Sequence, residues 1–277
     1  MKKKSKKTGL KITLIILCLL YLTLGFFSLE ACLENKEIQQ MIQLFINQPS
    51  SCTYSLQYDM NFCKIENKEY DITPSFFKST LDKQFYIGNR GDILISLESE
   101  TKPPLKQILT FYAGGHAALV DENGLLVEIT GLNSSPELNV VQNSYNYWLL
   151  DAKTMKESFI LRDSFLALKV TKASLNKRNI AMQTATSYIG QRYNYTFLFN
   201  TKKTHYCTDI VSKAYQNVDI NLNKDGFITT TQDLVLSQAT QIFLYKEINK
   251  KHSQGTHNIY YLDDGIEYDF DEFLTIQ

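Results

Sequence analysis

The sequence lacks the features that would place it at once in several common classes. Its 29 basic and 29 acidic residues cancel to a formal net charge of +0, so bulk charge does not favour nucleic acid as a partner. Its five cysteines include no Cys-x-x-Cys pair, which argues against a structural zinc site. Neither an internal repeat nor a low-complexity linker is present. With 44% hydrophobic and 21% charged residues, the chain is expected to fold around an ordinary core, without a metal or a cofactor.

Charge is nevertheless distributed unevenly along the 277 residues. Lysines crowd the N-terminus, at positions 2, 3, 4, 6 and 7, and carboxylates crowd the C-terminus between Asp263 and Glu272. These carboxylates lack the spacing of a calcium-binding loop, so residues 251–277 are interpreted as an acidic, solvated tail. We expect His252 and His257 to be exposed in that tail.

An uncharged apolar run from Ile12 to Leu29 follows the lysines. It is long enough to cross the core of a bilayer, which takes about 17–25 helical residues. Residues 1–30 are therefore interpreted as a cytoplasmic basic stretch followed by a membrane anchor or signal segment. By the positive-inside rule, the rest of the chain lies outside, tethered to the cell membrane by a single span.

This segment has two alternative fates. It stays uncleaved as a signal anchor, which we favour, or it is cut before Cys32 and the cysteine is lipidated. The second alternative arises because Leu29-Glu30-Ala31-Cys32 resembles a bacterial lipoprotein cleavage box, from which Glu30 departs. Both alternatives tether the chain to the outer face of a membrane.

The next part of the chain, residues 31–86, is interpreted as a juxtamembrane accessory region. Apolar residues recur there at helical spacing between positions 35 and 47. Outside the cytoplasm, Cys52 and Cys63 could form a disulfide that closes a short loop. Cys207 would then be left unpaired, as a reactive thiol requires.

The main folded domain is expected over residues 87–250, where short β-type runs begin. Two of these runs, His116–Asp121 and Leu125–Thr130, flank Asn123-Gly124 and predict a β-hairpin. The glycine pair Gly114-Gly115 leaves space beside the histidine, so a backbone or a ligand could approach closely there.

The register of this hairpin decides which side chains meet. A three-residue loop places Ala118 opposite Glu128, so that His116 and Glu128 share one face of the sheet. A two-residue Asn-Gly turn would place the two side chains on opposite faces. We expect the three-residue loop, because it brings an acid to the histidine.

The second chemical feature is Cys207, at the start of a predicted helix. Apolar residues recur at helical spacing behind it, at Ile210, Val211, Ala214 and Tyr215. The partial positive charge of a helix N-terminus favours thiolate over thiol. A buried structural cysteine is the alternative, since free cysteines are commonly buried.

Six motifs follow one another along this domain: Gly91-Asp92-Ile93-Leu94, Gly115-His116-Ala117-Ala118-Leu119-Val120, Glu128, Gly190-Gln191-Arg192-Tyr193, Tyr206-Cys207-Thr208-Asp209-Ile210-Val211, and Thr231-Gln232-Asp233-Leu234 with Ser237. In this order they resemble the motifs of the YiiX/YaeF-like proteins, which are circularly permuted papain-fold amidases of the NlpC superfamily. The resemblance covers roughly residues 88–248. Thr208-Asp209 replaces a Ser-Glu pair and Thr231 replaces a frequent proline, but neither change removes a reacting atom.

The resemblance implies an α+β, circularly permuted papain-like (NlpC-type) fold. In it a small antiparallel sheet that carries the histidine packs against a nucleophile-bearing helix, here preceded by an N-terminal transmembrane helix. Permutation accounts for His116 preceding Cys207. Residues 87–250 then become the permuted papain-like catalytic domain.

The proposed roles follow from this arrangement. Cys207 is expected to be the nucleophile and His116 the base that takes its proton. Glu128 would orient the imidazole and stabilise its charged form. The Cys207 N–H is a natural oxyanion donor, and Tyr206 or Tyr193 could supply a further oxyanion or substrate-positioning contact.

We therefore expect a membrane-tethered, extracytoplasmic cysteine hydrolase that cleaves an amide bond in cell-wall peptides or peptidoglycan fragments. A lipid-directed acyl hydrolase or acyltransferase, acting on an acyl-amide substrate at the same Cys-His site, is the first alternative. A non-catalytic cell-surface binding module on the same fold is the second, against which the intact Cys207, His116 and Glu128 argue. His205 is a rival base by its proximity to the cysteine.

Overall fold

The computed structural model describes residues 2–47, 49–56, 59–66, 76–78, 85–99, 103–122, 125–129, 139–143, 148, 164–197, 201–224, 226, 228–250 and 254–263. Its elements in chain order are α1 (Lys2–Ile46), β1 (Pro49–Ser55), β2 (Met60–Glu66), β3 (Phe76–Lys78), β4 (Phe85–Ile87), β5 (Ile93–Ser96), α2 (Leu105–Tyr112), β6 (His116–Val120), β7 (Leu126–Glu128), β8 (Val141–Asn143), β9 (Phe165–Val170), α3 (Leu175–Thr186), β10 (Arg192–Tyr193), β11 (Thr204–His205), α4 (Cys207–Gln216), α5 (Thr231–Leu236), β12 (Thr240–Ile248) and β13 (His257–Asp263).

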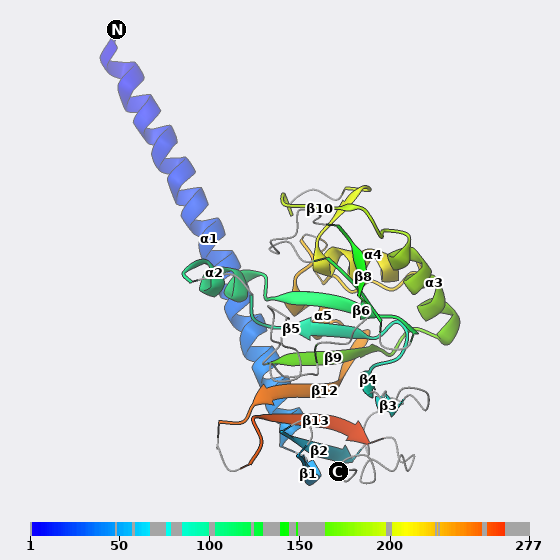
Figure 1. The fold of residues 1–277 in the computed structure, drawn as a ribbon. Coiled ribbons are helices and arrows are strands. Elements are labelled where there is room, and N and C mark those ends of the chain that lie inside the picture. The colour runs from blue at the N-terminus through cyan, green and yellow to red at the C-terminus, as the bar shows by residue number, and fades with distance from the viewer. Residues whose placement is uncertain are drawn as a thin grey trace.

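One mixed sheet dominates the fold (Figure 1). Its nine described strands lie in the order β1-β2-β13-β12-β9-β5-β6-β7-β8. Neighbouring strands are antiparallel, apart from β13 and β2, which run parallel. Every residue of β5, β6 and β9 is buried, so these central strands form the middle of the core. Helix α4 packs on β6, which is the expected α+β arrangement of a cysteine helix on the histidine strand.

The sheet is larger than the small antiparallel sheet expected from the sequence. Strands β1 and β2 come from the region that was interpreted as accessory, and β13 comes from the segment that was interpreted as a solvated tail. The carboxylates of that segment begin only at Asp263, and the strand itself buries Ile259 and Leu262. The expectation that His257 is exposed is wrong, because this residue is only 8% exposed in β13. His252 lies outside the described residues.

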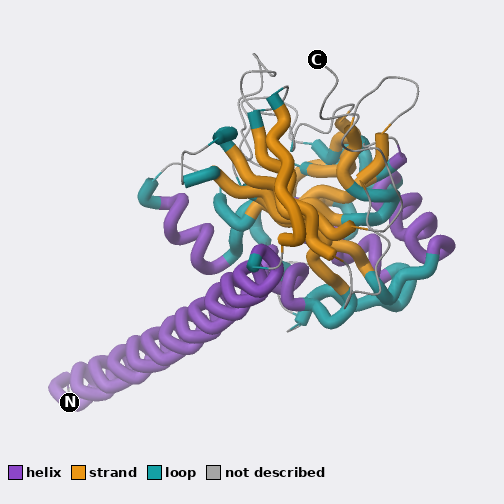
Figure 2. The backbone as a smooth tube through the Cα atoms, turned by 90° about the horizontal axis from the view of Figure 1, so that it is seen from below, coloured by secondary structure: helices purple, strands orange, loops and turns teal. Residues whose placement is uncertain are grey.

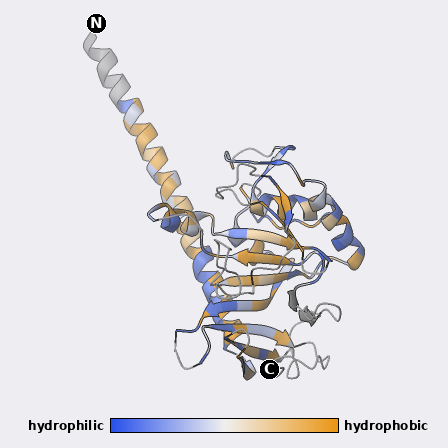
Figure 3. Ribbon diagram, in the orientation of Figure 1, coloured by the Kyte–Doolittle hydropathy of each residue, from blue (hydrophilic) through white to orange (hydrophobic). Residues whose placement is uncertain are grey.

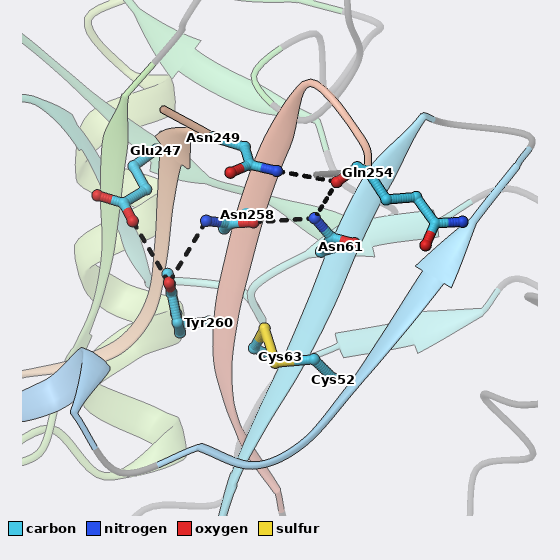
Figure 4. Close-up of a disulfide and its surroundings, with 8 residues drawn as sticks. All are labelled: Cys52, Asn61, Cys63, Glu247, Asn249, Gln254, Asn258 and Tyr260. Carbon is cyan, nitrogen blue, oxygen red and sulfur yellow. Dashed lines mark hydrogen bonds between the residues drawn. A yellow bond between two sulfur atoms is a disulfide. The ribbon is translucent and has the colours of Figure 1, made fainter. Parts of the chain in front are cut away.

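A disulfide joins β1 to β2 at the edge of the sheet (Figure 4). Cys52 and Cys63 are directly opposed in the strand register, as the pairing considered from the sequence requires. Asn61 of β2 in turn bonds Asn258 of β13, with Nδ2 and Oδ1 3.0 Å apart, and donates to the Gln254 carbonyl at 2.6 Å. The disulfide joins β1 to β2, and these hydrogen bonds join β2 to β13 and to the residues just before it.

Helix α1 leaves the domain as a long projecting rod (Figures 1 and 2). Its part from Lys11 onward is long and apolar enough to cross a membrane, and the most apolar stretch is fully outside the domain. Its last turns are different, since Ile38, Ile42 and Phe45 are buried in the core. The helix expected between positions 35 and 47 is therefore the continuation of the apolar segment. Figure 3 shows this change along α1, from a hydrophobic stretch to a stretch of mixed hydropathy next to the domain.

A buried ion pair holds the elements behind the cysteine helix together. Arg178 of α3 donates from Nη1 to Oδ1 of Asp92 at 2.8 Å and also donates to the Val170 and Ala173 carbonyls. Both charged side chains are buried. The hydroxyl of Tyr215 in α4 donates to the Gly91 carbonyl, next to this ion pair. The start of β5 thus fixes the positions of α3 and α4.

We predict that Arg178→Met lowers the free energy of unfolding by about 3–5 kcal/mol, because it leaves the buried Asp92 carboxylate without its counter-charge. Urea denaturation of the full chain in detergent measures this change. The exposed Lys172 provides the control, and Lys172→Met should change the same quantity by less than about 0.5 kcal/mol. Pairing Arg178→Met with Asp92→Leu should restore part of the loss. If Arg178→Met and Lys172→Met changed the free energy of unfolding equally, the role of the ion pair would be contradicted.

Candidate active site

The hairpin formed by β6 and β7 has the register expected from the sequence. Leu119 is paired with Val127 and Val120 with Leu126, and the Asp121 N–H donates to the Leu125 carbonyl at 2.6 Å. This register leaves three residues, 122–124, in the loop. The two turn residues at 123 and 124 lie outside the described residues. The prediction of a three-residue loop over a two-residue turn is thereby confirmed.

This register brings His116 and Glu128 into contact on one face of the sheet. Nε2 of His116 lies 2.7 Å from Oε2 of Glu128. His116 is 5% exposed and Glu128 is fully buried. A carboxylate in such a place needs a charged or hydrogen-bonding partner, and the imidazole supplies one. The contact also fixes the orientation of the ring.

Cys207 faces the same imidazole from α4. It is the first residue of that helix, and Tyr206 is the N-cap. Its thiol shares a hydrogen bond with His116, and the backbone N–H groups of Ala117 and Thr208 also donate to the sulfur. Because Glu128 occupies Nε2, Nδ1 is the ring nitrogen left for the thiol. Cys207 is partly exposed, so a substrate can reach it.

The electrostatics of the pair favour a thiolate and an imidazolium. Burial raises the pKa of Cys207, but the hydrogen bond and charge of His116 and the two N–H groups outweigh burial, and the pKa is lowered. Burial lowers the pKa of His116, but its bonds to Cys207 and Glu128 outweigh burial and raise the pKa from 6.5 to about 10. Each group thus stabilises the charged form of the other.

Comparison with known proteins agrees with this geometry. The sequence pattern of the family described as "Permuted papain-like amidase enzyme, YaeF/YiiX, C92 family" matches residues 90–267. The chain belongs to this family. Among solved structures, it is similar to the crystal structure of the metalloprotein yiiX from Escherichia coli O157:H7, with 16% sequence identity and a TM-score of 0.40 over 56% of this chain and 95% of that chain. No curated protein matches the chain.

Family membership establishes the class of chemistry. The family consists of permuted papain-like amidases, so the chain is a cysteine hydrolase of the amidase or peptidase class that acts on a peptide-like substrate. The fold and enzyme class expected from the sequence are confirmed. The family match begins at residue 90, three residues after the expected start of the domain at 87. It ends at residue 267 and therefore includes β13. The family pattern therefore covers the strand that the sequence interpretation had assigned to the tail.

The two tyrosines singled out in the sequence lie on the α4 side of the site. Tyr193 of β10 is close enough for the Cys207 thiolate to raise its pKa, although burial is the larger cause. The hydroxyl of Tyr206 accepts a hydrogen bond from the Thr229 N–H at 3.1 Å. Burial and the charge of Asp209 raise the pKa of Tyr206 to about 12. The charge of Cys207 thus contributes to the raised pKa of both tyrosines, and Tyr206 is in addition anchored to Thr229 by its hydrogen bond.

Trp148 is a site residue whose role the sequence did not reveal. Its indole stacks on the His116 ring, with centroids 5.9 Å apart and planes 22° apart, and packs edge-on against Phe165. It is fully buried. The one available signal was that it is the sole tryptophan of the chain.

His205 does not face the cysteine. Its Nδ1 lies 3.1 Å from Oδ2 of Asp209 and its Nε2 lies 3.0 Å from Oε1 of Gln191. Its ring stacks on Tyr188 with the centroids 4.2 Å apart. Asp209 also pairs with Lys213 at 2.7 Å. Both ring nitrogens of His205 are thus engaged in a buried network away from the reacting groups, which removes it as the rival base.

The glycine pair before His116 serves packing of the protein itself. Gly114 has a φ of +73°, and a Cβ there would overlap the side chain of Thr231. A Cβ on Gly115 would overlap the backbone carbonyls of Ser96 and Glu98. Of the two uses that the sequence left open, close approach of backbone is the one observed at Gly115. Thr231, which stands where the family often has proline, donates its N–H to the Ala113 carbonyl at 3.2 Å.

We predict that Cys207 reacts with iodoacetamide as a thiolate at about pH 6, where an ordinary thiol is protonated. In His116→Ala the pKa of Cys207 rises because the neighbouring positive charge is lost, and labelling at that pH falls by at least about tenfold, the equivalent of one pKa unit. Mass spectrometry of digested peptides measures labelling at each site. Cys32, exposed on α1, is the internal control and should label equally in both proteins. Superimposable Cys207 profiles would show that the imidazole does not activate the thiol.

Proposed function

We propose that this chain is a single-pass membrane protein whose domain outside the cytoplasm cleaves amide bonds of cell-wall peptides through a thioester on Cys207. The observation that carries the proposal is the buried contact of His116 with Glu128, set against a cysteine at a helix N-terminus. In the proposed site Cys207 is the nucleophile, His116 the base and acid, and Glu128 the orienting group.

The proposed reaction begins from the charged pair. The thiolate of Cys207 attacks the carbonyl carbon, and the C=O π electrons move onto the oxygen. The backbone N–H of Cys207 donates to this oxyanion, with Tyr193 or Tyr206 as a further positioning contact. When the oxyanion collapses, the C–N bond breaks and the imidazolium of His116 protonates the leaving amine.

Hydrolysis of the thioester completes the proposed cycle. Neutral His116 takes a proton from water as the water oxygen attacks the thioester carbon. The C–S bond then breaks and the acid product leaves, which regenerates the thiolate and the imidazolium together. Glu128 orients the ring and stabilises the imidazolium in both halves of the cycle.

Two features support a position outside the cytoplasm, and a third bears on whether the anchor is cleaved. The lysines at positions 2, 3, 4, 6 and 7 precede the apolar part of α1, as in segments that keep their N-terminus inside. The Cys52–Cys63 disulfide is of a kind that persists in oxidising compartments. Helix α1 runs without a break past Cys32 to Ile46, which favours an uncleaved anchor over lipidation of Cys32.

One observation favours the lipid-directed alternative as a second candidate. Tyr195 and Phe197 expose their rings and pack against Tyr193, with ring centroids 4.8 Å and 6.0 Å from it. Exposed aromatic rings packed on a proposed substrate-positioning tyrosine suit an acyl chain as well as an apolar peptide side chain. A lipid amide would react at Cys207 by the same steps.

The substrate class is tested with the full chain in detergent micelles. Muropeptides from a digested cell wall and an N-acyl amide lipid are incubated separately with the wild type and with Cys207→Ala, and the products are identified by mass spectrometry. We expect new amine and acid fragments from muropeptides with the wild type only. Cleavage of the lipid alone would replace the proposed substrate with the alternative, and cleavage by Cys207→Ala would remove Cys207 from the mechanism.

We predict that Glu128→Gln lowers kcat by roughly 10²- to 10⁴-fold, because a neutral amide cannot stabilise the imidazolium. KM should change little, since Glu128 is buried behind the histidine. Glu122 is the matched control: it lies at the loop of the same hairpin with its side chain 68% exposed, and Glu122→Gln should keep kcat within about twofold. Retained activity in Glu128→Gln would exclude Glu128 from the catalytic machinery.

A further inference from the structure

Helix α2 carries an apolar face that the domain leaves uncovered. Leu105, Ile108 and Tyr112 are 50%, 54% and 42% exposed. Their spacing of three and four residues places them on one face of the helix. Each of the eight described residues of α2 keeps some exposure. Lys106, on another side of the helix, pairs with Glu98 at 2.8 Å. The helix is therefore amphipathic, with its apolar side turned outward.

The position of α2 is set by contacts to α1. The hydroxyls of Tyr112 and Ser28 share a hydrogen bond of 2.6 Å. Nδ2 of Asn35 donates to the Phe111 carbonyl at 2.9 Å. Ser28 lies one residue before the end of the uncharged apolar run at Leu29. Tyr112, one of the three exposed residues, thus contacts the last turns of the segment that is apolar enough to cross a membrane. Figures 1 and 3 show α2 lying beside α1.

We propose that α2 lies in the outer interface of the bilayer, with Leu105 and Ile108 in the boundary between headgroups and acyl chains. The proposal rests on the membrane anchor of the proposed function. An amphipathic helix at an interface buries its apolar face about 5–10 Å into this boundary, and tyrosine is enriched at the same depth. The continuity of the two apolar surfaces is what selects lipid over a protein partner. If α1 spans the bilayer, its contacts with α2 bring Tyr112 to the membrane surface.

This placement has a consequence for access to the catalytic site. Only Ala113, Gly114 and Gly115 separate α2 from His116. A Cβ at either glycine would overlap neighbouring groups, so this short connection is tightly packed. An interfacial α2 therefore holds the histidine end of β6 close to the bilayer surface. Substrates attached to or lying against the membrane would reach the site there.

Tryptophan fluorescence tests the position of α2 directly. The chain has a single tryptophan, Trp148, which is fully buried and provides a constant background. Ile108→Trp in the full chain is reconstituted into phosphatidylcholine vesicles, with and without lipids brominated on the acyl chain near the headgroup. Leu175→Trp is the matched control, since Leu175 is an exposed aliphatic residue on α3, away from α1. Tyr21→Trp, within the apolar part of α1, reports on the anchor itself.

We expect bromolipid to quench the added emission of Ile108→Trp by at least about twofold, to quench Tyr21→Trp similarly, and to leave Leu175→Trp unchanged. Quenching of Tyr21→Trp without quenching of Ile108→Trp would overturn the interfacial position of α2 and leave the anchor intact. If neither is quenched, the anchor and the interfacial helix both fall. Equal quenching at positions 108 and 175 would mean nonspecific adsorption and would also overturn the proposal.

Discussion

The contact between the His116 imidazole and the Glu128 carboxylate is the constraint on which the site depends. The two residues lie on the neighbouring strands β6 and β7, and their side chains share one face of the sheet. Both are almost fully removed from solvent. A buried carboxylate without a partner is costly, so the contact stabilises the hairpin register as well as the ring orientation. The same contact leaves one ring nitrogen for Cys207. Strand register, ring orientation and thiol activation are thus consequences of one buried interaction.

The cysteine is held by an independent set of contacts. The Thr208 hydroxyl donates to the Thr229 carbonyl at 2.6 Å next to the nucleophile, and Tyr215 bonds the Gly91 carbonyl near the other end of α4. The Arg178–Asp92 ion pair fixes the backbone next to Gly91, whose carbonyl accepts the hydrogen bond of Tyr215. Because displacements of about 1 Å can cost a large part of an enzyme's rate, these contacts matter for reactivity as well as stability. The His205–Asp209 network belongs to the same support and not to the chemistry.

The relation between the anchor and the domain is also built into the packing. One helix continues from the apolar segment into the core, where Ile38, Ile42 and Phe45 are buried. A continuous helix is stiffer than a flexible linker, so it transmits an orientation as well as a tether. The Cys52–Cys63 disulfide and the β2–β13 pairing attach the residues that follow this helix to the same sheet. The end of α1, β1 and β2 are therefore structurally part of the domain.

Local sequence signals determined much of this protein: the apolar run before Leu29, the hairpin around the glycine at 124, the helix that begins at Cys207 and the family to which its motifs belong. Each of these depends on spacing within a short stretch of chain. Tertiary structure decided what no local pattern encodes. It placed β13 between β2 and β12, stacked Trp148 on His116, and turned His205 away toward Asp209. These outcomes depend on contacts between residues far apart in sequence or on the direction of a side chain, and sequence spacing alone specifies neither.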